Sequence, residues 1–251
     1  MIKTAIHIFK TYRTNKATLQ GFRQMFDQFN ALDKNKKLPN EWKDIYPCLN
    51  DNTPTTEFDA HYIYHPAWAA RIVRDLRPAK HIDISSTLHF CSVLSAFIPV
   101  EFYDYRPAAL RLSDLKSDRA DLTQLHFGSN SIESLSCMHT IEHIGLGRYG
   151  DPIDPEGDVK AINELKRVVA PNGSLLFVVP VGKPRIAFNA HRIYDPQLIK
   201  TLFSGFTLKK FSLVTDQRDF IDEADFGQAS QQDYGCGCFW FIKQAAGNTN
   251  L

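Results

Sequence analysis

Apolar residues near the start of the chain recur every three or four positions, which is typical of helices that bury one face. Two groups follow this spacing: Ile2, Ile6, Phe9 and Tyr12, then Leu19, Phe22, Met25 and Phe29. Residues 30–39 are polar and lysine-bearing, and this composition favours a loop. We therefore predict a helical N-terminal extension over residues 1–60.

From residue 81 onward, short apolar runs alternate with helical patterns, which is typical of βαβ units and a largely parallel sheet. The predicted strands cover residues 81–84, 100–104, 132–138, 174–179, 206–214 and 238–242. The predicted helices cover 62–76, 88–97 and 196–203, and a further helix begins with Asp158 as its N-cap. This pattern predicts a doubly wound α/β domain over residues 61–245, followed by a frayed tail over residues 246–251.

The composition indicates a folded chain with a substantial core, since 43% of its 251 residues are hydrophobic. Its net charge of +1 argues against an extended polyanion-binding surface, so we expect no nucleic-acid partner. No apolar run approaches the ~20 residues of a membrane span. The five cysteines form no even disulfide framework, which favours a reducing, cytoplasmic location.

Candidate ligand-binding residues follow the predicted strands, because open α/β sheets bind ligands outside the carboxyl ends of their strands. Ser85 and Ser86 come directly after the first strand. Asp104 ends the second strand, 21 residues beyond Asp83. A carboxylate at about this offset accepts hydrogen bonds from a ribose diol in nucleotide-binding βαβ units. Asp121 and Leu122 offer a polar and an apolar group near the expected adenine edge.

These motifs resemble those of class I S-adenosylmethionine-dependent methyltransferases. The similarity covers roughly residues 80–243 and includes the acidic residues above, the segments 136–143, 161–180 and 188–196, and the turn Gly205-Phe206. Within that class, the chain is most similar to the family named domain of unknown function 268. Segments like 61–65, 145–152 and 235–239 recur in that family.

The resemblance implies a seven-stranded, mostly parallel sheet and methyl transfer from S-adenosylmethionine to a small-molecule or glycan-type acceptor. It implies the following cofactor-binding residues: Asp83, Ser85, Ser86, Asp104, Tyr105, Asp121, Leu122 and His139. His143 and Glu142 are the catalytic candidates, since a histidine near neutrality can take a proton from an acceptor hydroxyl while a carboxylate orients it. His139 is the alternative base.

The first loop departs from the class, whose pattern is rich in glycine at this point. Residues 83–90 read Asp-Ile-Ser-Ser-Thr-Leu-His-Phe and contain no glycine. A side chain at each position disfavours positive φ angles and hinders the close approach of the backbone to a ligand. Either the hydroxyls of Ser85 and Ser86 replace backbone contacts, or the chain is a non-catalytic binding or assembly component with a degenerate loop.

Two further motifs match known patterns by letter. His139-x-x-Glu142-His143 matches the inverted zinc-protease motif, but it ends a predicted strand rather than lying on a helix, so we expect no metal there. Packing at the start of a helix is the alternative to the catalytic role. Residues 145–150 match G-x-G-x-x-G, but Asp151-Pro152 follows them, which favours a loop over a dinucleotide site. Such a loop near the strand ends could act as a lid.

Other conspicuous side chains favour structural roles. The aromatic cluster of His61, Tyr62, Tyr64, His65 and Trp68 is more typical of helices packed across a sheet than of stacking on a sugar ring. His191 and Arg192 suit a capping or surface role as well as substrate contact. Cys236 and Cys238 are too closely spaced for a Cys-x-x-Cys pair, so we interpret them as core thiols.

Overall fold

The computed structural model describes residues 16–245. The predicted face of Ile2, Ile6, Phe9 and Tyr12 and the predicted tail over residues 246–251 lie outside this range. The chain divides into two compact units, Met1–Glu57 and Phe58–Leu251.

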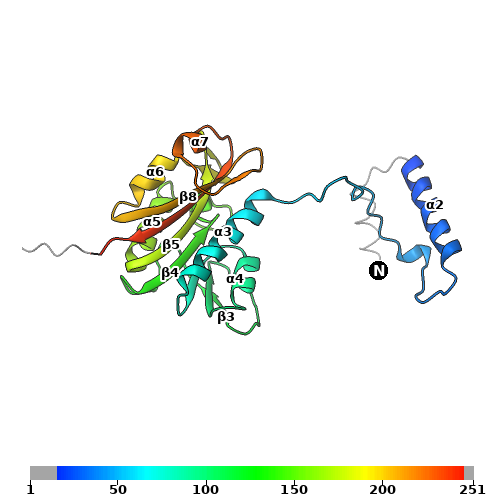
Figure 1. Ribbon diagram of the computed structural model, residues 1–251, viewed down its shortest axis with the longest axis horizontal. Helices are drawn as coiled ribbons and strands as arrows, with labels where there is room; N and C mark the ends of the chain where they lie inside the picture. The colour runs from blue at the N-terminus through cyan, green and yellow to red at the C-terminus, as the bar shows by residue number, and fades with distance from the viewer. Residues whose placement is uncertain (1–15, 246–251) are drawn as a thin grey trace, which may run out of the picture. The chain divides into compact units, whose positions relative to one another are not determined.

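The first unit contains helix α2 (Lys16–Leu32) and the short 3-10 helix η1 (Trp42–Asp44) (Figure 1). Phe22 and Phe26 pack against Trp42, with ring centroids 6.1 and 5.1 Å away. Other apolar side chains of α2 are exposed: Leu19, Met25, Phe29 and Leu32. The predicted apolar stripe is therefore only partly covered within this unit.

The second unit is built on an eight-stranded sheet in the order β3-β2-β1-β4-β5-β10-β8-β9. Its strands are β1 (His81–Ile84), β2 (Val100–Asp104), β3 (Leu115–Arg119), β4 (Ile132–Met138), β5 (Val169–Val181), β8 (Phe206–Val214), β9 (Phe220–Ile221) and β10 (Gly235–Lys243). Strands β1 to β5 pair in parallel, whereas β10 is antiparallel to both β5 and β8. The doubly wound, mostly parallel sheet is confirmed, and the two-residue β9 extends it at one edge.

Helices cover both faces of the sheet (Figure 1). Their bounds are α3 (Ala60–Leu76), α4 (Leu88–Leu94), η2 (Ile141–His143), α5 (Gly157–Val168), α6 (Pro196–Leu202) and α7 (Phe226–Ser230), and β6 (Arg185–Ala187) pairs with β7 (His191–Ile193) in a separate hairpin. Residues of α3 and α4 share one apolar core with the sheet, and those of α5, α6 and α7 share the other.

Helix α5 begins earlier than the sequence indicates. Its N-cap is Glu156, so the prediction of Asp158 as N-cap was wrong. The Asp158 carboxylate instead accepts a hydrogen bond from the Tyr194 hydroxyl at 2.9 Å and lies 3.4 Å from Arg192 Nε. Tertiary partners therefore hold this carboxylate within the first helical turn. The Arg192 guanidinium also donates to the carbonyls of Ile144 and Pro155, which is a structural role.

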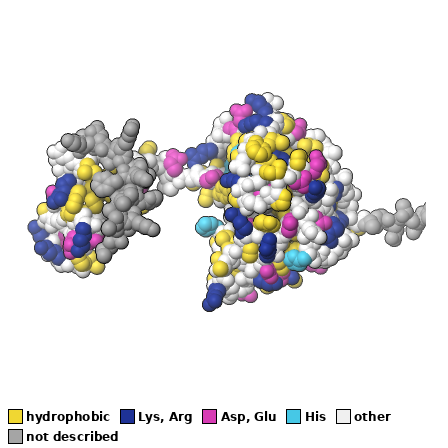
Figure 2. Space-filling view, turned by 180° about the vertical axis from the view of Figure 1, so that it is seen from behind, with side chains coloured by type: hydrophobic (Ala, Val, Ile, Leu, Met, Phe, Trp, Pro, Cys, Tyr) yellow, Lys and Arg dark blue, Asp and Glu magenta, His cyan; other side chains and the backbone are white. Residues whose placement is uncertain are grey.

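The surface carries charges of both signs. On the face seen in Figure 2, Lys and Arg side chains are interspersed with Asp and Glu side chains. This mixture on that face agrees with the near-neutral sequence. None of the helices within residues 16–245 has the length and hydropathy that crossing a bilayer requires.

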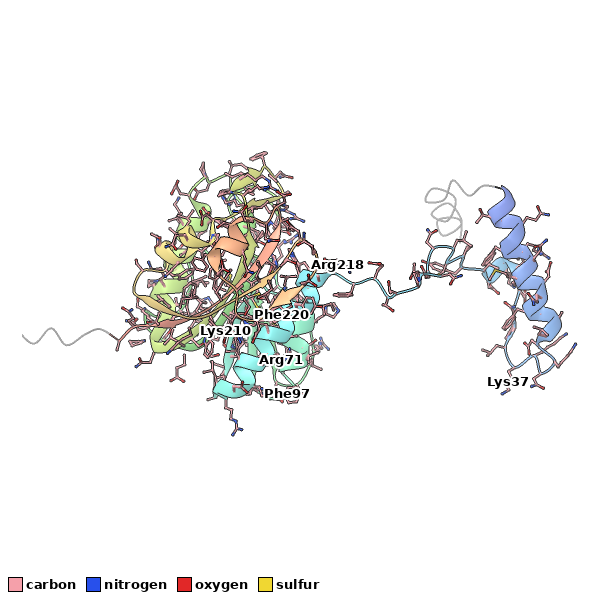
Figure 3. The ribbon with its side chains drawn as sticks, turned by 45° about the horizontal axis from the view of Figure 1, so that its top comes forward. Lys37, Arg71, Phe97, Lys210, Arg218 and Phe220 are labelled. Carbon is pink, nitrogen blue, oxygen red and sulfur yellow. The ribbon has the colours of Figure 1, made fainter. Side chains whose placement is uncertain are left out.

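The amino end of α3 is fixed against the β8–β9 hairpin (Figure 3). The Arg218 guanidinium donates to the Phe58 carbonyl and lies 4.8 Å from the centroid of the Phe58 ring. Tyr64 stacks on Phe220 at a centroid distance of 5.5 Å. These contacts place the first turns of α3 over the carboxyl edge of the sheet, where strand order reverses between β1 and β4.

Candidate active site

The loop after β1 has a glycine-like backbone although it contains no glycine. Ser85 has a φ of +58°, in the left-handed region that non-glycine residues rarely adopt. Its amide and its hydroxyl both donate to the Tyr103 carbonyl, at 2.7 and 3.2 Å. Thr140 donates to the Ser85 carbonyl at 2.9 Å. These bonds compensate for the backbone strain, so a side chain here did not prevent the positive φ.

The neighbouring Ser86 fastens this loop to the end of β4. Its hydroxyl accepts a hydrogen bond from the Met138 amide at 3.0 Å, and its amide donates to Asp83 Oδ1 at 2.9 Å. Both predicted serine hydroxyls therefore have partners within the fold. The Ser86 hydroxyl also interacts with the Asp83 carboxylate, and this interaction opposes the rise in the pKa of Asp83 that burial causes.

Asp83 lies beneath the loop in a buried polar network rather than on a cavity wall. Ser136 donates its proton to Asp83 Oδ2, so it must accept from His81 Nε2, which lies 2.8 Å away. The Ser134 hydroxyl donates to His81 Nδ1 at 2.8 Å. Burial raises the pKa of Asp83 to about 6 and lowers the pKa of His81 to about 3.

A first cavity of about 250 Å³ lies at the carboxyl ends of β2 and β3. Six of the predicted cofactor-binding residues line it: Ser85, Asp104, Tyr105, Asp121, Leu122 and His139. Asp104 Oδ1 accepts from the Arg106 amide at 2.7 Å, and Asp121 Oδ1 accepts from Thr123. The two carboxylates therefore border the same space and are oriented by the turns that follow them.

A second cavity of about 360 Å³ adjoins the first. Ser85, His139, His143 and Tyr149 line both cavities. The remaining walls of the second cavity come from Tyr62, Ser86, Thr87, Met138, Glu142, Arg148, His191 and Tyr234. The structure thus brings every predicted site residue except Asp83 to one of two adjoining spaces.

Glu142 lies between the two histidines of the H-x-x-E-H segment. Its Oε1 is 2.8 Å from His139 Nδ1 and 3.8 Å from His143 Nε2, and only 1% of its side chain is exposed. The segment folds as a strand end followed by the 3-10 helix η2, which does not form the helical arrangement of the inverted zinc-protease motif. The glutamate therefore contacts both imidazoles.

His143 has a defined tautomer. Its Nδ1 lies 2.6 Å from the Ala190 carbonyl, so this nitrogen carries the proton and donates it. Burial lowers the pKa of His143, and the nearby Glu142 carboxylate opposes that shift. The ring is therefore neutral near pH 7 and offers Nε2 as a proton acceptor.

The glycine-rich segment 145–150 folds as a loop around one carboxylate. Asp151 Oδ2 accepts from the amides of Gly145 and Gly147, at 2.8 and 3.3 Å. Both glycines have positive φ angles, +79° and +70°. The segment follows η2 rather than a strand and opens no helix, so the loop interpretation is confirmed against the dinucleotide one.

The aromatic cluster at the start of α3 contributes more to the second cavity than its packing interpretation predicts. Trp68 is buried in the core, as the packing interpretation requires, but Tyr62 lines the second cavity. The His61 ring lies 5.4 Å from that of His139 and 5.3 Å from that of Tyr234. Burial lowers the pKa of His61 to about 4 and raises that of Tyr62 to about 12. The only sequence signal for these contacts was the unusual density of His and Tyr at the start of α3.

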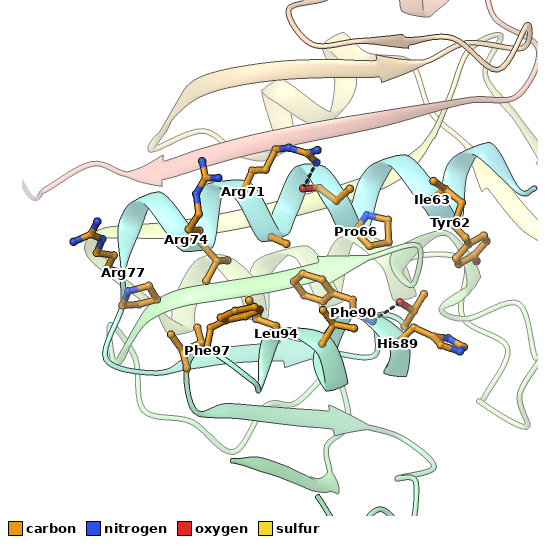
Figure 4. A pocket seen from close by; sticks show the side chains of 17 residues that line it. Tyr62, Ile63, Pro66, Arg71, Arg74, Arg77, His89, Phe90, Leu94 and Phe97 are labelled. Atoms are coloured by element: carbon orange, nitrogen blue, oxygen red, sulfur yellow. Dashed lines mark hydrogen bonds between the residues drawn. The ribbon is translucent and has the colours of Figure 1, made fainter. Parts of the chain in front are cut away.

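An apolar groove of about 1160 Å³ runs between α3 and α4 (Figure 4). Its walls include Pro66, Phe90, Leu94 and Phe97, and Tyr62 lies at the end that meets the second cavity. The groove is larger than either cavity, and its surface is mainly apolar although Arg71, Arg74 and Arg77 border it. Reactive chemistry therefore belongs to the strand ends and not to this groove.

The model of the family described as "Caenorhabditis protein of unknown function, DUF268" matches residues 109–233. The family resemblance is confirmed. The DUF268 match includes Asp121, the H-x-x-E-H segment and the glycine-rich loop. A search of curated protein sequences finds no match.

Solved structures share the fold. The N-methyltransferase NodS from Bradyrhizobium japonicum WM9, in complex with S-adenosylhomocysteine, has a TM-score of 0.54 and 14% identity, covering 88% of this chain and 98% of NodS. The 1,6-didemethyltoxoflavin-N1-methyltransferase from Burkholderia thailandensis, with bound 1,6-didemethyltoxoflavin and S-adenosylhomocysteine, has a TM-score of 0.53 and 12% identity, covering 72% of this chain and 79% of that enzyme. At such identities the similarity establishes the Rossmann-like methyltransferase fold.

Proposed function

We propose that the chain is an S-adenosylmethionine-dependent methyltransferase that acts on a small-molecule or glycan-type acceptor. The observation that carries the proposal is the convergence of Asp104, Asp121 and Leu122 on one cavity that adjoins the cavity of Glu142 and His143. Both structural neighbours named above are methyltransferases crystallised with S-adenosylhomocysteine, which supports the same ligand here.

The residues present fit this cofactor. Asp104 would hold the ribose diol, and Asp121 and Leu122 the adenine. Ser85 and His139 lie where the two cavities meet, and Ser86 lines the second cavity beside the expected amino-acid end. The cofactor supplies an electrophilic methyl group when it is bound. The chain itself supplies positioning and exclusion of water.

A hydroxyl acceptor must lose a proton as it is methylated, and His143 is placed to take it. Nε2 carries the lone pair because Nδ1 donates to the Ala190 carbonyl. Glu142 Oε1, 3.8 Å from Nε2, would stabilise the imidazolium that results. We expect His143→Gln to lower turnover by roughly 10²- to 10⁴-fold while leaving the affinity for S-adenosylhomocysteine unchanged.

The binding experiment is calorimetric titration of the chain with S-adenosylhomocysteine. We expect one site, weakened about 10- to 100-fold in Asp104→Ala because a hydrogen bond to a charged group is lost. Asp118→Ala is the matched control, since Asp118 lies on the adjacent β3, is exposed and pairs with Lys116 at 3.5 Å. Absence of binding to the unmodified chain would contradict the proposal.

The rival function is a methyltransferase fold that binds a ligand without catalysis. The observation that favours it is the use of both serine hydroxyls in internal hydrogen bonds. Incubation with methyl-labelled S-adenosylmethionine and a panel of sugars and sugar nucleotides separates the two functions. Transfer of label that His143→Gln abolishes supports the enzyme, and binding without transfer across the panel supports the rival.

A further inference from the structure

Three metal-ligating side chains meet beside the second cavity. His61 comes from α3, His139 follows β4, and Cys236 lies in β10. Their ligand atoms all lie within 4.8 Å of one another. The three residues are far apart in the sequence, and the sheet order together with the placement of α3 brings them together.

The hydrogen bonding of His139 leaves its Nε2 free to bind a metal ion. Its Nδ1 lies 2.8 Å from Glu142 Oε1 and carries the proton, so Nε2 carries the lone pair. That nitrogen is buried and has no hydrogen-bond partner among the described residues, and only 3% of the side chain is exposed. A carboxylate that orients a histidine in this way is the usual outer partner of a metal-bound imidazole.

The buried carboxylate of Glu142 also favours a cation at this site. Its side chain is 1% exposed, and Oε2 has no hydrogen-bond partner in the part of the chain that is described. A buried carboxylate that is only partly satisfied is costly unless positive charge lies close by. A metal ion on the far side of the His139 ring would provide that charge.

We propose that His61, His139 and Cys236 bind a zinc ion, with Glu142 as the outer partner of His139. Two imidazoles and one thiolate form a donor set that suits zinc. Tetrahedral zinc needs ligand atoms about 3.4–3.7 Å apart, so the cluster must contract by about 1 Å. The imidazole centroids are already 5.4 Å apart, close to the roughly 5 Å of two rings that share a zinc ion. Binding releases the proton of the Cys236 thiol.

Three protein ligands leave a fourth position for water or another oxygen. His139, Tyr62 and Tyr234 line the second cavity, so an acceptor oxygen there could reach this position. That role rests on the proposed function, whereas zinc binding itself does not. The measurement of zinc content and the measurement of methyl transfer therefore test the two proposals independently.

The test measures zinc stoichiometry and affinity on the full chain, loaded with zinc and dialysed, by metal analysis and competition with a chelating dye. We expect one zinc per chain. Cys236→Ser and His61→Gln should each weaken binding by more than roughly 100-fold, and Glu142→Gln by roughly 10- to 100-fold. Cys137→Ser is the matched control, because Cys137 is a buried strand cysteine on β4 and lies outside the cluster.

Cobalt substitution provides a second readout. Bound Co²⁺ should show a thiolate charge-transfer band in the near ultraviolet that is lost in Cys236→Ser and kept in Cys137→Ser, with circular dichroism confirming that both variants fold. Zinc below one-tenth of an equivalent, a copper ion bound in its place, or full affinity in Cys236→Ser would overturn the site. Calorimetry with S-adenosylhomocysteine on the same samples keeps this outcome separate from failure of the proposed function.

Discussion

The Thr140 hydroxyl donates a hydrogen bond to the Ser85 carbonyl, with 2.9 Å between Oγ1 and O. This bond joins the loop after β1 to the segment after β4, across the point where strand order reverses. Ser85, which accepts this bond, and His139, which precedes Thr140, both have left-handed backbones, with φ angles of +58° and +55°. Strained residues of this kind persist when their surroundings fix them, and they concentrate at functional sites.

Thr140→Val removes the hydroxyl and keeps the shape of the side chain. We expect a loss of about 1 kcal/mol in the free energy of unfolding, measured by urea denaturation, because the Ser85 carbonyl loses this donor. Thr201→Val is the control, since Thr201 is exposed and donates within its own helix. Equal effects in both variants would show that the loop-to-loop bond has no particular importance.

The conformation of Ser85 predicts an unusual order of stability among substitutions. Ser85→Gly and Ser85→Ala both lose the hydroxyl bond to Tyr103, but only glycine relieves the left-handed backbone. We expect the glycine variant to be more stable than the alanine variant by about 1 kcal/mol in urea denaturation. At Ser86, which has no positive φ, the order should be reversed. An alanine variant at position 85 as stable as the glycine variant would be inconsistent with this backbone.

His81 should make the protein sensitive to acid. Its pKa is lowered by burial to about 3 in the fold, against about 6.5 when unfolded, so the unfolded chain binds the extra proton between these values. Stability is therefore lost as the pH falls from 6.5 toward 3. His81→Gln should flatten the dependence of the unfolding free energy on pH by about 1.4 kcal/mol per pH unit in that window. An unchanged slope would show that His81 is not neutral in the fold.

Asp83 contributes to the pH dependence of the unfolding free energy with a sign opposite to that of His81. Burial raises its pKa to about 6, so between pH 4 and 6 the folded chain holds the extra proton. Stability from this group therefore rises as the pH falls through that window, which partly offsets His81. Asp83→Asn should make acid destabilisation steeper between pH 6 and 4, as followed by urea titrations at several pH values. A shallower slope would mean that Asp83 is ionised throughout that window.

The sequence predicted the buried strands β1 and β4 and missed the mostly exposed β3. β1 and β4 are almost fully buried and were predicted with their observed bounds. In β3, only Leu115 is buried, so the pattern carries no strand signal. That strand forms because the edge of β2 offers hydrogen-bonding partners. Pairing with a neighbour is invisible to local periodicity.

The same distinction applies to the candidate site. The convergence of Asp104, Glu142 and His143 was predictable because residues after parallel strands share one edge of the sheet. Asp121 follows the unpredicted β3 and was placed instead from the expected adenine edge. The meeting of His61 with Cys236 depends instead on how α3 packs over that edge, which no local pattern encodes. The backbone of Ser85 was also beyond prediction, since hydrogen bonds to the Tyr103 carbonyl and from the Thr140 hydroxyl override the preference of serine.

The most direct test of the central claim is a crystal structure of the chain with S-adenosylhomocysteine. We predict one molecule spanning both cavities, with its ribose hydroxyls on the Asp104 carboxylate, its adenine beside Leu122 and its sulfur near Ser85 and His139. A ligand bound elsewhere, such as in the groove between α3 and α4, or a Ser85 side chain that closes the passage between the two cavities, would contradict the account.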